Sequence, residues 1–177
     1  MKTPAIIAFL VLVAAAASAA AQPVLRYDPP KSFYRSAIAP PDDYSAKEFN
    51  ASVQVYPFRT FSGSIEEMFR RTLLRGWIEP RFQEGKLAAP PEIRAVKVTG
   101  AEAAFTASFV ENIGTGLPRQ HMRMVIVSGN AAAIVDASAI SIEAWQQVLP
   151  ALNAMTATLK VAAGGPKLGK DPGTVKR

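Results

Sequence analysis

The chain has 177 residues, no cysteine, one histidine and a formal net charge of +6 at pH 7. The lack of cysteine excludes disulfides, thiolate nucleophiles and cysteine-based zinc or iron–sulfur centres, and one histidine is too few for the usual zinc ligand sets. We therefore expect neither a metal site nor a bound cofactor.

The first 21 residues have the pattern of a secretory signal peptide. A lysine precedes an unbroken apolar run, Ala5–Ala17, and Ala19–Ala21 supplies small residues before Gln22. The run has 13 residues, whereas a bilayer span needs about 20. We expect cleavage near Ala21/Gln22 and a soluble protein in the periplasm or outside the cell; retention of the segment as an anchor is the alternative. The residues that remain fit one ordinary domain with a sizeable core.

The positive charge is concentrated near the C-terminus. Residues 160–177 contain five Lys or Arg and one Asp, which gives +4, whereas residues 22–159 contain 14 Lys or Arg and 13 Asp or Glu. Because the body of the domain is nearly neutral, we expect no nucleic-acid partner. Residues 162–177 are rich in Gly, Pro and Lys, which predicts a disordered, solubilising tail. A weak electrostatic contact of this tail with anionic lipid or glycan is the alternative.

An extended arm is predicted at the start of the domain, where four prolines between residues 29 and 41 lie among aromatic residues. Proline removes a backbone donor and holds its neighbours extended. A strand follows, because Val53 and Val55 alternate with Gln54 and Tyr56, as in a strand with one buried face.

The strongest helix signal begins at Ser64, a capping residue that Glu67 can complete as a capping box. Apolar residues from Ile65 to Leu73 recur at helical spacing, which indicates one buried side. Gly76 suits the end of the helix, and Pro80 opposes its continuation. Three arginines near the predicted end match the helix dipole.

From residue 93 the pattern is typical of an antiparallel meander. Its predicted parts are a strand at 93–100, a strand at 103–112, a Gly-rich hairpin loop, a strand that includes 122–127, a tight turn at 128–130 and a strand at 131–137.

The last predicted element is an amphipathic helix over 141–161, with Ser141 as its cap and Trp145 in its apolar stripe. Pro150 interrupts the stripe, so either the helix bends there or a second helix begins there. The predicted fold is therefore α+β: one domain, 22–161, in which an antiparallel β-meander sheet is covered by a C-terminal helix and one earlier helix.

This order of elements resembles the α+β sandwich of the PsbP/Mog1-like proteins, whose chain ends in a similar helix across an antiparallel sheet. The resemblance covers residues 24–161 and includes "SIEEMFRRTLL" in the first helix and "SIEAWQQVLPALNAM" in the last. It implies a binding or assembly-assisting module rather than an enzyme. It carries over no site residue, because no site motif is shared, and a likeness of fold is weak evidence for function.

Three polar residues form the candidate binding site. Arg119, His121 and Arg123 share one face of a predicted strand, while Met122, Met124 and Ile126 share the other face, which is directed to the core. Two neighbouring cations should lower the pKa of His121, and arginine binds carboxylates and phosphates at two points. We predict a ligand or partner surface here; an ordinary solvated face is the alternative.

A histidine with a lowered pKa also suits general-base catalysis. Asp136 lies on the adjacent predicted strand and Ser138 directly after it, and both would have to approach His121 to form a triad. The sequence contains no G-x-S-x-G motif and no phosphate-binding loop of the P-loop type. We therefore predict no catalytic residue.

These observations predict an exported periplasmic or envelope protein that binds a protein partner non-covalently, as an accessory or assembly factor. Two alternatives belong to other classes. One is a small hydrolase or ligand-modifying enzyme that uses His121, and the other is a structural envelope component whose basic tail contacts lipid or glycan.

Overall fold

The structure is a computed structural model, and it describes residues 22–37, 41–84, 87, 91–112 and 118–164. The predicted signal peptide, most of the predicted tail and the Gly-rich loop lie outside these residues. Within them, no helix is both long and apolar enough to cross a membrane.

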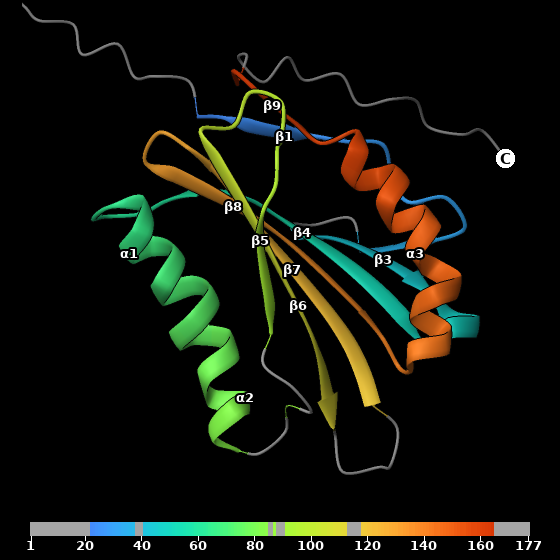
Figure 1. The fold of residues 1–177 in the computed structure, drawn as a ribbon. Helices are drawn as coiled ribbons and strands as arrows, with labels where there is room; N and C mark the ends of the chain where they lie inside the picture. Colours follow the sequence, from blue (N-terminus) through green and yellow to red (C-terminus); the bar gives the residue numbers. More distant parts are fainter. Residues whose placement is uncertain (1–21, 38–40, 85–86, 88–90, 113–117, 165–177) are drawn as a thin grey trace, which may run out of the picture.

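A seven-stranded antiparallel sheet lies between two helical layers (Figure 1). The strands, in spatial order, are β2 (Tyr34–Ala37), β3 (Asp42–Ala46), β4 (Ala51–Thr60), β8 (Ala131–Ala139), β7 (Pro118–Ser128), β6 (Ala103–Asn112) and β5 (Glu92–Ala95). A short 3-10 helix, η1 (Lys47–Phe49), joins β3 to β4. The meander β5–β6–β7–β8 and the α+β class are as the sequence predicts, although β5 ends at Ala95, earlier than expected.

The first helix is longer than predicted. It consists of α1 (Ile65–Phe69), a π-helical segment η2 (Arg70–Ile78) and α2 (Glu79–Gln83). The expectation that it ends at Gly76 is wrong, because the wider π-helical turn passes through that glycine. The return to α-helix at Glu79 places Pro80 in the first turn of a new segment, where a missing N–H is best tolerated.

The C-terminal helix α3 (Ile142–Ala157) is continuous through Pro150. The sequence leaves open whether one helix bends at Pro150 or a second helix begins there, and the structure has a single helix. Ser141 caps it as predicted, since its Oγ accepts a hydrogen bond from the Ala144 N–H at 3.1 Å. The buried side of α3 packs against the sheet through Ala144, Val148, Leu152 and Met155.

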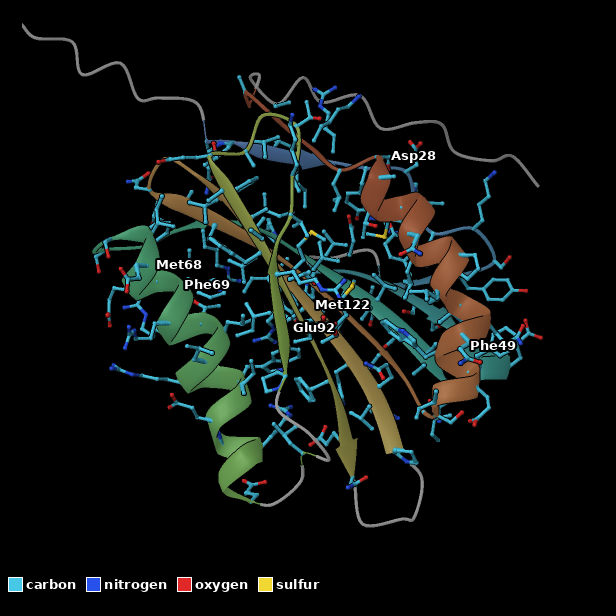
Figure 2. All side chains as sticks on the ribbon, viewed as in Figure 1. Asp28, Phe49, Met68, Phe69, Glu92 and Met122 are labelled. Carbon is cyan, nitrogen blue, oxygen red and sulfur yellow. The ribbon has the colours of Figure 1, made fainter. Side chains whose placement is uncertain are left out.

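Each face of the sheet has its own hydrophobic core, and Figure 2 shows side chains filling the space between the sheet and the helices. Alternation sorts the strand residues, because successive side chains point to opposite faces. On β7, Met124 and Ile126 face α3. Val125 and Val127 face the first helix, where they meet Met68 and neighbouring apolar residues.

A separate two-stranded ribbon joins the two ends of the described domain. It consists of β1 (Val24–Arg26) and β9 (Lys160–Ala162), which pair antiparallel. The sequence prediction included neither strand: it placed Lys160 and Val161 in the last helix, which in fact ends at Ala157, and Ala162 in the disordered tail. A three-residue strand is too short to show a periodic pattern, and it forms here because the ribbon packs Leu25 and Val161 against the core on the α3 side.

Candidate functional site

The candidate site lies on the face of the sheet that also carries the first helix. Along β7, this face is polar at Arg119, His121 and Arg123 and apolar at Val125 and Val127. Next to the polar part is a cavity of about 310 Å³. Trp77 and Arg81 of the first helix form one of its walls. Its polar strand residues are Ser52, Gln54 and Tyr56 of β4, His121 and Arg123 of β7, and Asp136 and Ser138 of β8.

Arg123 is engaged within the fold. Its Nε and Nη2 donate to the two carboxylate oxygens of Asp136, each at 2.6 Å, and its guanidinium lies 4.3 Å from the ring centroid of Trp77. Nη1 is also 3.5 Å from the Thr72 carbonyl oxygen. Because these contacts occupy the guanidinium, Arg123 shapes the wall of the cavity and has little donor capacity left for a ligand.

His121 is held between aromatic and acidic neighbours. Its ring stacks on Phe109, with centroids 5.1 Å apart, and its Nε2 lies 2.8 Å from Glu111 Oε2. The contact is not aligned as a hydrogen bond, and Nε2 is buried. Burial is the main cause that lowers the pKa of His121, and the nearby charge of Glu111 opposes the shift. The cations Arg81 and Arg119 add to the lowering. The sequence thus predicts the direction of the shift, but not its main cause.

Glu111 is a buried carboxylate at the end of β6, with 8% of the residue exposed. Besides His121, it approaches Arg81, whose Nε lies 3.4 Å from Glu111 Oε1. Arg81 in turn donates from Nη1 to the Trp77 carbonyl oxygen at 2.8 Å. Sequence reasoning missed Arg81, because the helix was expected to end before it. The sequence does contain a signal for Glu111, which lies near the end of the strand predicted at 103–112, just before the hairpin loop that leads to Arg119. In the structure Glu111 and Arg119 are directly opposite each other.

Arg119 differs from the other two arginines. Its Nη1 lies 3.4 Å from Ser138 Oγ, and no carboxylate in the described part of the chain is within ion-pair distance of it. The cluster contains three arginines, Arg81, Arg119 and Arg123, and two carboxylates, Glu111 and Asp136. Its net charge with a neutral histidine is therefore +1, and Arg119 is the cation without a carboxylate partner.

The triad considered for catalysis is not assembled. Asp136 binds Arg123, and the Ser138 hydroxyl lies 3.2 Å from the Ser52 hydroxyl. His121 instead approaches Glu111. Within the described ranges, no three His, Asp or Glu side chains are grouped so that they could hold a metal ion.

No protein-family model matches the sequence, and comparison with curated proteins found no match. Among solved structures, LpqN of Mycobacterium tuberculosis, described as involved in cell envelope biogenesis, is similar with a TM-score of 0.55 and 12% identity over 80% of this chain and 85% of LpqN. Cyanobacterial PsbP from Synechocystis sp. PCC 6803 is similar with a TM-score of 0.49 and 12% identity over 85% of this chain and 99% of PsbP.

A protein of unknown function from Pseudomonas aeruginosa is similar with a TM-score of 0.44 and 12% identity, over 75% of this chain and 78% of that protein. Among these similarities, the one to LpqN is consistent with the α+β fold that the order of elements predicts. At 12% identity they concern the fold alone.

Proposed function

We propose that the protein is an exported accessory protein of the bacterial envelope, which binds a protein partner non-covalently at the polar cavity. The signal-peptide pattern of the first 21 residues supports export. The similarity to LpqN, described as involved in cell envelope biogenesis, supports a role in the same compartment.

The observation that carries the proposal is the Arg119 guanidinium, which has no carboxylate partner among the described residues and contacts Ser138, a residue that lines the polar cavity. An arginine without a carboxylate partner favours an anionic group, which it can bind at two points. Ser138 lies beside Arg119, Ser52 lies beside Ser138, and both serines supply a hydroxyl group. We infer that the partner presents a carboxylate here, from an acidic side chain or a chain terminus.

One observation favours the enzymatic alternative: His121 lies beside Glu111, and a carboxylate can orient a catalytic imidazole. However, the only hydroxyl considered as a nucleophile, that of Ser138, interacts with Ser52 and Arg119. A His121→Gln variant tests this alternative, because a hydrolase that depends on the imidazole loses its activity, whereas a binding protein keeps its partner.

Photo-cross-linking in cells tests the proposed function. A photoreactive residue replaces Ser45 of β3, which pairs with Ser52 of the neighbouring strand β4. Cross-linked proteins from the periplasmic fraction are then identified by mass spectrometry. We expect one discrete partner, which is lost in Arg119→Ala. The matched control is Arg71→Ala, which removes an exposed arginine of the first helix. Equal capture by both variants, or no partner at all, overturns the proposal.

A further inference from the structure

The β1–β9 ribbon brings the two ends of the described chain to one place (Figure 1). Arg26 pairs with Lys160 in the register, and Val24 pairs with Ala162. Beyond the ribbon the two segments stay in contact, since a Cβ on Gly164 would lie 2.2 Å from the Gln22 carbonyl oxygen. The chain therefore enters and leaves the domain side by side.

The two faces of this ribbon differ in character. Leu25 and Val161 point inward and pack against the core. Arg26 and Lys160 are both exposed and lie directly opposite each other, and neither has a carboxylate partner among the described residues. Like charges in directly opposed positions destabilise a strand pair, so this pair has a cost for folding. An anionic partner would remove that cost.

The outward face also has an apolar component. Val24, on the same side of β1 as Arg26, is 45% exposed. The sequence that continues from the ribbon on its C-terminal side is also cationic. Residues 165–177 contain four cations and one anion. Cations next to exposed apolar groups favour the boundary of an anionic membrane, where headgroups meet acyl chains.

We propose that the outer face of the β1–β9 ribbon docks on a membrane that contains anionic phospholipids. Arg26 and Lys160 contact the phosphate groups, and Val24 inserts at the level of the headgroups. Glycans and nucleic acids are also anionic, but they give no reason for an exposed valine on the same side of β1 as Arg26.

This docking leaves the polar cavity accessible. Ser128, at one end of β7, lines a hollow together with Val161 of the ribbon, whereas Arg119 lies near the other end of the same strand. Nine residues of strand separate Arg119 from Ser128, which corresponds to about 30 Å. A domain attached through its ribbon would therefore present the cavity away from the membrane. The inference does not depend on the partner proposed for the cavity.

Vesicle flotation tests this inference. The protein purified from the periplasmic fraction is mixed with phosphatidylcholine vesicles that contain or lack phosphatidylglycerol, at low and at physiological salt. We expect binding that requires phosphatidylglycerol and weakens with salt. Each cation at such a surface contributes about fivefold in affinity, so the Arg26→Gln/Lys160→Gln variant should bind about 25-fold more weakly.

The matched control is Lys47→Gln/Arg71→Gln, which removes the same charge from exposed positions elsewhere and should leave binding within about twofold of the original. A thermal melt checks folding, and removal of the like-charge pair should not lower the melting temperature. Equal losses in the two double variants overturn the proposal, because they indicate attraction by total charge. Binding that is lost only when residues 165–177 are removed, or binding to an anionic glycan without binding to vesicles, also overturns it.

Discussion

Arg123 and Asp136 form a two-point ion pair between adjacent strands. The two residues are partners in the β7–β8 register, both of their hydrogen bonds measure 2.6 Å, and their side chains are only 17% and 20% exposed. The pair fixes the orientation of Arg123 on Trp77. It thereby shapes the cavity next to Arg119.

Removal of one partner of this ion pair should lower the free energy of unfolding more than removal of both partners. Asp136→Leu leaves a largely buried guanidinium without its carboxylate, and we expect a loss of about 2 kcal/mol in the free energy of unfolding. The double variant Asp136→Leu/Arg123→Met replaces both charges by apolar groups and should recover at least half of that loss. Urea denaturation of the two single variants and the double variant measures the coupling. Additive losses would show that the pair does not act as a unit.

Acidification should destabilise the protein through His121. Burial lowers the pKa of this imidazole below its ordinary value of 6.5 in the folded protein, so the unfolded chain takes up the proton at a higher pH. The stability that the neutral ring contributes is complete above about pH 6.5, and it is lost as the pH falls towards the lowered pKa. Three charged groups face the ring. Glu111 opposes the lowering of the pKa, and Arg81 and Arg119 add to it.

The measurement is the free energy of unfolding as a function of pH for the original protein and for His121→Gln. Carboxylates elsewhere titrate in both proteins, so the difference between the two curves isolates the histidine. Below pH 6.5 we expect the original protein to lose more of its free energy of unfolding than His121→Gln loses. A flat difference across that range contradicts the prediction.

The sequence predicts the elements whose signals are local. Ser64 caps the first helix through the Glu67 N–H at 3.1 Å, and β6 spans Ala103–Asn112 as its alternation indicates. Long-range features are not predictable in this way. The end of the first helix depends on a π-helical turn around Gly76, and the ribbon depends on pairing between segments more than 130 residues apart, such as Arg26 and Lys160.

The candidate site follows the same rule. Alternation places Arg119, His121 and Arg123 on one face, which the structure retains. It does not indicate which carboxylate pairs with which cation. Glu111 and Asp136 lie on different strands, and only the strand order makes both of them neighbours of β7.

Gly100 should resist substitution for two separate reasons. Its φ of +76° favours glycine, and a Cβ there would lie 2.4 Å from the Val161 carbonyl oxygen in β9. The control is Gly129→Ala, where φ is +57° and a Cβ meets nothing within 4 Å. We expect the control to lose about 1 kcal/mol from the backbone conformation, and Gly100→Ala to lose more.

Hydrogen exchange locates the effect of this substitution. The Val161 N–H donates to the Thr99 carbonyl oxygen at 2.8 Å, so displacement of β9 in Gly100→Ala should accelerate exchange at Val161. In Gly129→Ala that amide should exchange at its original rate. Equal stability losses in the two variants, with Val161 unaffected in both, would show that the close approach at Gly100 is unimportant.

Gly76→Ala should destabilise the protein, although alanine is normally the better residue inside a helix by about 0.5–1 kcal/mol. In the π-helical segment a Cβ at position 76 would lie 2.8 Å from the Arg71 carbonyl oxygen, and backbone cannot give way as a flexible side chain can. We expect the free energy of unfolding to fall by about 1 kcal/mol, the usual cost of overpacking. The control for helix propensity is Asn153→Ala, at an exposed position inside α3. It should raise the free energy of unfolding by about 0.5 kcal/mol. Opposite signs for the two variants in urea denaturation would support the π-helical geometry, and a gain in both would mean that this stretch is an ordinary α-helix in solution.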